Sequence, residues 1–226
     1  MSRTFLITVI GVIGLTSILA AQQAEADAPA VSWRLLNLAG GIAEAESAVN
    51  AHLELGFVPV GIEFGADGSL VVLLGRDLPD TVTGWGISEH SDWNALESDI
   101  NERIRGGYRP ADISKHGNAL YVLWLQSTAE LAGWRIHAAA EDRDSRSETI
   151  QGFEESGFVL RGMSSFEGLD WFLFVRPTTG EAATQIRTFG FDPIALRDGI
   201  NDEVARGSSP RGIGIDTRGY VVVLGD

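Results

Sequence analysis

Four histidines are the side chains of this 226-residue chain best suited to metal binding or acid–base chemistry. His90 and His137 stand near the ends of two segments that we expect to be equivalent strands, where they could bind a metal or act as a general base. They follow Trp85 and Trp134 by five and three residues, so their positions are not truly equivalent. The spacing therefore favours two strand-end or loop histidines, and we keep both as candidate ligand contacts.

Motifs for a catalytic nucleophile are absent. The segments "GMSSF" at Gly162 and "GISEH" at Gly86 do not match Gly-x-Ser-x-Gly, and Ser-x-x-Lys does not occur. Cysteine is also absent, which excludes thiol chemistry and disulfides. A hydroxyl nucleophile with an unrecognised base is the enzymatic alternative.

Acidic side chains could bind Ca²⁺ through their oxygens. The densest run consists of Glu141, Asp142, Asp144 and Glu148, with Arg143 and Arg146 interleaved. The run lacks the spacing and the central glycine of a calcium loop, so we interpret it as a solvated helix start whose acids suit the helix dipole and pair with the arginines. Glu63, Glu97 and Asp99 would suit a glycosidase only if two of them lay together. We expect no metal and no cofactor.

Amides and aromatic side chains are candidates for binding. The amides Asn50, Asn101, Gln151 and Asn201 recur at one position, either as structural hydrogen-bond partners of a neighbouring loop or as a set presented to a polar ligand. Six tryptophans could stack on sugars, although the recurrence of Trp33, Trp85 and Trp134 favours packing. The candidate ligand-binding residues are His90, Trp93, Asn101, Tyr108, Arg109 and His137.

A repeat of about fifty residues must position these side chains. Marker glycines Gly56, Gly107, Gly157 and Gly207 are spaced 51, 50 and 50 residues apart. An apolar i, i+4 stripe precedes each glycine and predicts a helix, which the glycine ends in a left-handed conformation. Ser91-Asp92 and Asp192-Pro193 are helix-start signals.

Two strands follow each helix and one precedes it. Gly61, Gly162 and Gly212, with Asp112 in the remaining copy, predict a bulge or a close backbone approach in the first of the two. The next strand, such as "LVVLL", is apolar on both faces and should be buried on both. The strand ahead of the helix is opened by Trp33, Trp85, Trp134 or Ile186.

We therefore expect an α+β fold of four tandem βαββ modules, at approximately 31–80, 81–130, 131–180 and 181–226, in a single repeat domain over 27–226. One such module would be marginal alone, so the modules should share a core. They could form a closed pseudo-symmetric α/β propeller, or layered sheets from two module pairs. Closure hides the sheet edges, which favours the ring.

The second copy has a recognisable aromatic rhythm. Its Trp85, Gly107-Tyr108-Arg109 and Tyr121-x-x-Trp124 resemble the bacterial tandem repeats that also accompany polyglycine hydrolases. The match rests on this one copy. The resemblance implies a repeat array that is not itself catalytic, because the chemistry of those proteins belongs to a separate β-lactamase-like domain.

The N-terminus and the charge indicate where the protein acts. Arg3, an apolar run from Phe5 to Ala20 and the small residues after it are typical of a signal peptide, which we place at 1–26. An uncleaved anchor is the alternative. The net charge of −14 argues against nucleic acid and against anionic membrane surfaces.

We expect an exported, periplasmic or extracellular, non-catalytic domain that binds a small molecule, a glycan or a protein. The alternatives are a small cell-envelope hydrolase and a structural or inhibitory protein with an acidic binding face.

Overall fold

The computed structural model describes residues 33–76, 81–128, 130–178 and 184–225, and the predicted signal peptide at 1–26 lies outside these ranges. Within them, no helix has both the length and the apolar composition that crossing a membrane requires.

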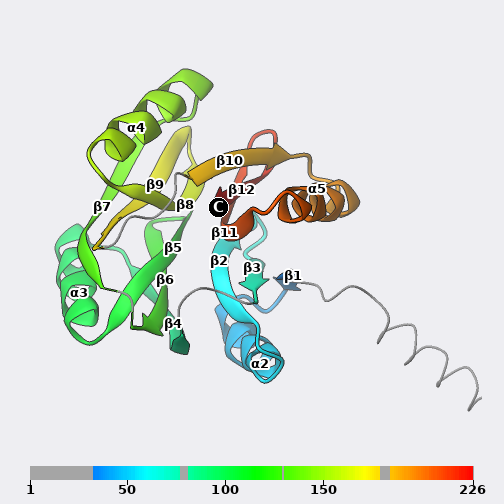
Figure 1. Ribbon diagram of the computed structural model, residues 1–226, viewed down its shortest axis with the longest axis horizontal. Coiled ribbons are helices and arrows are strands. Elements are labelled where there is room, and N and C mark those ends of the chain that lie inside the picture. The colour runs from blue at the N-terminus through cyan, green and yellow to red at the C-terminus, as the bar shows by residue number, and fades with distance from the viewer. Residues whose placement is uncertain (1–32, 77–80, 129, 179–183, 226) are drawn as a thin grey trace, which may run out of the picture. The chain divides into compact units, whose positions relative to one another are not determined.

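A strand–helix–strand–strand unit occurs four times in succession (Figure 1). Module 1 contains β1 (Trp33–Leu38), α2 (Ile42–Leu53), β2 (Val58–Phe64) and β3 (Leu70–Gly75). Module 2 contains β4 (Val82–His90), α3 (Trp93–Arg105), β5 (Tyr108–His116) and β6 (Ala119–Ser127). Module 3 contains β7 (Leu131–Ala140), α4 (Arg143–Glu155), β8 (Val159–Phe166) and β9 (Leu169–Pro177). Module 4 contains β10 (Thr184–Phe189), α5 (Pro193–Ala205), β11 (Ser209–Asp216) and β12 (Gly219–Gly225). The described residues thus form four helices and twelve strands, which confirms the α+β class.

Each module has its own three-stranded antiparallel sheet, with the orders β1-β3-β2, β4-β6-β5, β7-β9-β8 and β10-β12-β11. The last strand of the module is central and is buried on both faces, as predicted: all six residues of β3 are buried. The tryptophans do not all open the first strand. Only β1 begins at its tryptophan, whereas β4 begins at Val82 and β7 at Leu131, because both strands continue along the end of the central strand. In β10 the equivalent position is Thr184 and not Ile186 as predicted, because Thr184 pairs with the last residue of its central strand, Gly225.

The helices begin and end at the predicted signals. Asp92 and Asp192 cap α3 and α5 by accepting hydrogen bonds from the N–H groups of Ala95 and Ile194. The marker glycines have φ between +78° and +99°, a conformation that disfavours any side chain.

The recurring strand glycine predicted a bulge or a close backbone approach, and the structure has both at this position. A bulge interrupts each second strand at this point, for example between Pro59 and Gly61 in β2. The backbone approach is close as well, since a Cβ on Gly61 would lie 2.7 Å from the nitrogen of Ile213 in module 4.

Each helix packs on its own sheet and on the sheet of the next module. Ala45 and Val49 of α2, for example, share an apolar cluster with Leu123 and Leu125 of β6. Three further clusters join modules 2 and 3, modules 3 and 4, and modules 4 and 1. The second face of each sheet is therefore covered by the helix of the preceding module.

The second strands of the four modules contact one another: β2 contacts β5 and β11, and β8 also contacts β5 and β11. We call the polar side chains between them the polar centre: Glu63, Asp112, Ser114 and Ser164, all at most 2% exposed. Ser114 Oγ accepts from Phe64 N–H at 3.1 Å, and Ser164 Oγ accepts from Lys115 N–H at 2.9 Å. The polar centre therefore satisfies backbone groups at the free edges of these strands.

Candidate functional site

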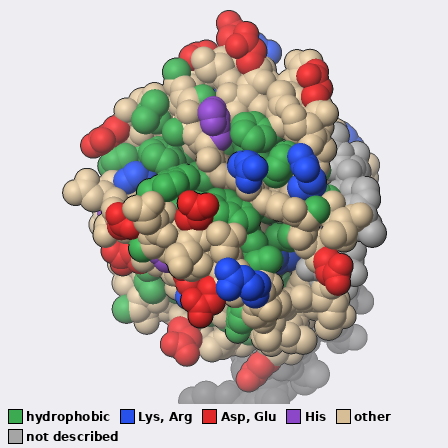
Figure 2. Space-filling view, turned by 90° about the vertical axis from the view of Figure 1, so that its left-hand side faces the viewer, with side chains coloured by type: hydrophobic (Ala, Val, Ile, Leu, Met, Phe, Trp, Pro, Cys, Tyr) green, Lys and Arg blue, Asp and Glu red, His purple; other side chains and the backbone are tan. Residues whose placement is uncertain are grey.

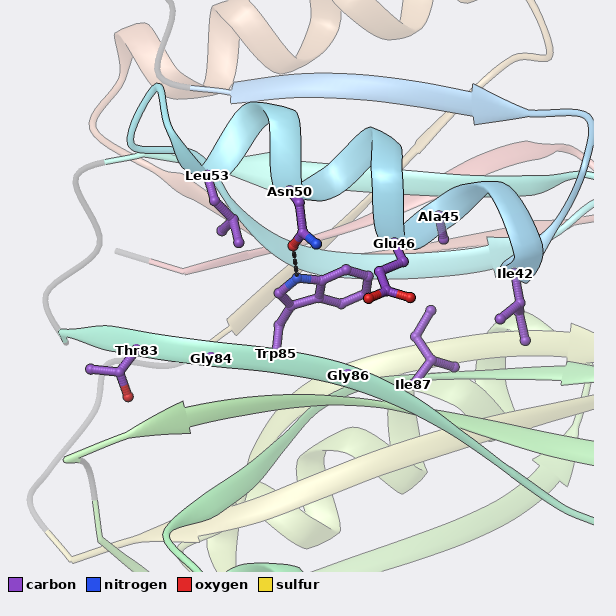
Figure 3. A pocket seen from close by; sticks show the side chains of 10 residues that line it. All are labelled: Ile42, Ala45, Glu46, Asn50, Leu53, Thr83, Gly84, Trp85, Gly86 and Ile87. Carbon is purple, nitrogen blue, oxygen red and sulfur yellow. Dashed lines mark hydrogen bonds between the residues drawn. The ribbon is translucent and has the colours of Figure 1, made fainter.

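A groove of about 470 Å³ lies between α2 and β4, where modules 1 and 2 meet (Figure 3). The helix contributes Ile42, Ala45, Glu46, Asn50 and Leu53, and the strand contributes residues 83–87. Because successive side chains of a strand point to opposite faces, Trp85 and Ile87 share the face towards α2. Thr83 lies at a bulge between Val82 and Gly84, and its side chain points away from the helix (Figure 3). Gly84 and Gly86 flank Trp85 and add no side chain to the opposite face.

Trp85 is held in this groove by a side chain of the other module. Its Nε1–H donates to Asn50 Oδ1 at 3.0 Å. Figure 3 shows the half-buried indole between α2 and β4, with Asn50 at its N–H and the carboxylate of Glu46 beside its six-membered ring. The hydrogen bond orients the ring without covering it.

The same tryptophan–asparagine hydrogen bond occurs at two further module junctions. Trp134 donates to Asn101 Oδ1 at 3.1 Å, and Trp33 donates to Asn201 Oδ1 at 3.0 Å across 168 residues of sequence. The structural interpretation of the recurring amide is therefore confirmed for three copies, with a tryptophan of the next module as the partner instead of a loop.

The groove offers polar groups beside the aromatic ring. Glu46 and Asn50 are exposed. Within the described part of the chain, Glu46 makes no ion pair and Asn50 Nδ2 makes no hydrogen bond. A carboxylate and an amide N–H beside an aromatic face can bind a sugar ring, which presents hydroxyls at its edge and C–H groups on its face.

His90 belongs to a polar cluster on the other side of β4. Its Nε2 lies 2.8 Å from Ser88 Oγ and 3.1 Å from Asp99 Oδ2, and Ser88 Oγ also accepts from Trp124 Nε1–H at 2.7 Å. A catalytic triad needs the serine and the carboxylate on different ring nitrogens. Here both contact Nε2, so the cluster lacks the arrangement for activating a nucleophile.

The other predicted candidates occupy several places. Asn101 is the partner of Trp134, and Trp93 is 48% exposed at the start of α3. Tyr108 opens β5 and lines a cavity of about 310 Å³, and half-buried Arg109 follows it.

His137 is in β7 of module 3, with its ring centroid 5.5 Å from that of Phe153. It lines a groove of about 450 Å³ with Phe158 and Arg176. Figure 2 views the side of the molecule that carries α3, α4 and β7, where hydrophobic side chains gather between basic and acidic ones. The structure thus divides the six candidates between modules 2 and 3, and their ligand-binding role stays a prediction.

The acidic run from Glu141 is a helix start. Asp142 caps α4 by accepting from the N–H groups of Asp144 and Ser145, and the bonds from Ser145 lower the pKa of the Asp142 carboxyl. Arg146 does not pair within the run as the sequence suggested; it binds Asp170 and Asp216. Three metal-ligating side chains do not gather anywhere among the residues described.

Sequence reasoning missed the polar centre. Burial raises the pKa of Glu63 well above its usual range. Burial acts in the same direction on the pKa of Asp112, whereas the hydrogen bonds from the N–H groups of Ile62, Ile213 and Ile113 favour its carboxylate form. The one available signal was Asp112 itself, which replaces a glycine of the other three copies.

No family model and no curated protein matches this chain.

Proposed function

We propose that the four modules form a closed pseudo-symmetric ring, an α/β propeller-like array. Three observations support closure over layered pairs: the second strands contact one another in a cycle, an apolar cluster joins module 4 to module 1, and Trp33 binds Asn201. In such a ring the four helix–strand junctions are equivalent, so differences among their grooves arise from side chains alone.

The function that the groove supports best is non-catalytic binding of a glycan by this exported domain. One observation carries the proposal: the half-buried indole of Trp85 lies in a groove of about 470 Å³ beside the exposed carboxylate of Glu46. Trp85 would stack on a sugar ring, while Glu46 and Asn50 Nδ2 would bind hydroxyls at its edge. A signal peptide at 1–26, which the sequence predicts, would place this ligand in the periplasm or outside the cell, so cell-wall fragments are the first probes to use.

Isothermal titration calorimetry with cell-wall fragments and a panel of oligosaccharides tests the proposal. Glu46→Gln should weaken binding by about tenfold or more, because a hydrogen bond to a charged acceptor contributes roughly 1.5–3 kcal/mol. Glu97→Gln is the matched control, since Glu97 has the equivalent position on α3 and should leave affinity unchanged.

Either of two results would contradict the proposal: the wild-type protein binds none of these glycans, or both substitutions weaken binding equally. Trp85→Phe and Trp134→Phe separate an effect on glycan affinity from an effect on protein stability. Each variant loses the same indole hydrogen bond, but only Trp85→Phe changes the ring on which the sugar is proposed to stack.

A further inference from the structure

Three backbone N–H groups from three modules converge on one carboxylate in the polar centre. Ile62 and Ile213 donate to Asp112 Oδ2 at 2.8 and 3.2 Å, and Ile113 donates to Oδ1 at 2.8 Å. These donors lie on β2, β11 and β5, and Asp112 is 0% exposed. Converging N–H groups form an anion-binding concavity because each presents the positive end of its dipole.

The other three modules leave room for this carboxylate. At the position of Asp112 they carry Gly61, Gly162 and Gly212. A Cβ on Gly61 would lie 2.9 Å from Asp112 Oδ2, and a Cβ on Gly162 would clash with Oδ1. The repeated backbone therefore makes a site with space for one carboxylate, which module 2 alone supplies.

We propose that the backbone N–H groups of Ile62, Ile113 and Ile213 form a binding site for one small monovalent anion within the polar centre. The Asp112 side chain is the resident occupant of this site. The site takes a free carboxylate ion of the size of formate when Asp112 is replaced by glycine. This inference is independent of the glycan proposal, because it concerns the contacts of Asp112 and none of the groove residues.

The test is chemical rescue of Asp112→Gly in the purified protein. This variant restores the glycine of the other copies and leaves the N–H groups of Ile62, Ile113 and Ile213 without their acceptor. Its Tm should fall by about 10 °C or more, since several buried donors lose their partner and each kcal/mol is worth about 2–4 °C for a protein of this size. Formate at 100 mM should restore at least half of that loss, and propionate at equal ionic strength should not, because its ethyl group exceeds the space left by the Asp112 side chain.

Two controls make the result specific. The wild-type Tm should shift equally in formate and propionate, because the site is filled. Asp112→Asn should be destabilised without rescue, because its amide occupies the site but turns an NH₂ group towards a donor. In NMR spectra of Asp112→Gly, formate should return the N–H resonances of Ile62 and Ile213 towards their wild-type positions.

The proposal is overturned if Asp112→Gly has the wild-type Tm without added anion, or if formate and propionate act equally on it. Should the variant not fold in plain buffer, refolding in either salt decides: folding in formate alone supports the site, and folding in both or in neither rejects it.

Discussion

The junction between modules 3 and 4 is built differently from the other three. At those three, a helix asparagine binds a tryptophan of the next module, and the helix buries an apolar residue at one equivalent position: Ala45, Leu96 or Leu196. In module 3 that position is Arg146 and the amide is Gln151, and Thr184 of module 4 stands where the other junctions have the tryptophan. Gln151 donates to Glu155 on its own helix instead.

An ion network takes the place of the tryptophan–asparagine pair. Arg146 is 7% exposed and donates through Nε and Nη2 to Asp170 of β9, at 2.8 and 3.1 Å. Its Nη1 donates to Asp216 of β11 in module 4 at 3.0 Å, and Arg218 also binds Asp216. The repeat thus fixes where a helix meets the next sheet, but the contact at that place can be apolar or ionic.

The largest expected effect is at Arg146. Arg146→Ala should lower the free energy of unfolding by about 3–5 kcal/mol, because it leaves Asp170 without its buried partner. Arg146→Leu/Asp170→Leu should recover most of this loss, because module 2 has leucine at both equivalent positions, Leu96 and Leu120. Asp216 would still form its ion pair with Arg218. Urea unfolding measures both variants. A double variant as unstable as Arg146→Ala would show that the ionic junction has no apolar equivalent.

Acid should weaken this junction. Burial alone would raise the pKa of Asp216, but hydrogen bonds from Arg218 and Arg146 outweigh it and lower the pKa below its usual value. The resulting stability is present above the unfolded-state pKa of about 3.9 and is lost as the pH falls through the lower folded-state value. Asp216→Asn should therefore cost about 2 kcal/mol at pH 7, and the difference from wild type should shrink below about pH 3.9. A difference that stays constant from pH 7 to pH 2.5 in urea titrations would argue against the ion pairs.

Glu63 of the polar centre should respond to pH in the opposite direction. Burial raises the pKa of Glu63, so its stabilising contribution is complete below the unfolded-state pKa of about 4.3 and declines as the pH rises towards the folded-state value. Glu63→Gln should be more stable than wild type at pH 7, by about 1.4 kcal/mol for each unit between the two pKa values. The same titrations measure this gain, which should vanish towards pH 4. A loss of stability at pH 7 would mean that Glu63 is buried as a carboxylate.

The three tryptophan–asparagine pairs should have similar energies. Trp33→Phe, Trp85→Phe and Trp134→Phe each remove one indole N–H and should each cost about 1 kcal/mol. Thermal unfolding of the three variants checks this. If Trp33→Phe proved several times more costly than the other two, the contact between modules 4 and 1 would carry a closing role beyond its hydrogen bond.

The smallest effect comes from building the missing pair. Gln151→Asn/Thr184→Trp should give the fourth junction the hydrogen bond of the others and add up to about 1 kcal/mol, because Thr184 pairs with the central strand where the three tryptophans do. Each single substitution lacks a partner and is the control. A gain confined to the double variant, measured as a double-mutant cycle, would show that the junctions are interchangeable. An additive cycle would show that the ion network has changed the spacing there.

Local chemistry was sufficient to predict the elements. The left-handed glycines, the caps at Asp92 and Asp192 and the bulge before Gly61 depend on residues close in sequence, and all were correct. Prediction failed where the partner came from elsewhere in the chain. Arg146 was assigned to its neighbouring acids because the sequence does not show that Asp170 and Asp216 lie beside it.

The candidate site was harder to predict for the same reason. Trp85 was expected to pack, and it does, but its partner Asn50 lies 35 residues away on another module. Glu46 and Asn50 are four residues apart and share one face of the predicted helix, but neither could be linked to Trp85 without knowing that α2 crosses beside β4.

The sequence by itself determined the βαββ unit, its four copies and the ends of its helices, because these follow from apolar periodicity and from glycines with positive φ. Only the tertiary structure decided which modules touch, which amide holds which tryptophan, and that Asp112 fills a space between strands of different modules. Those outcomes depend on contacts between residues 33 to 168 positions apart, and no local pattern specifies them.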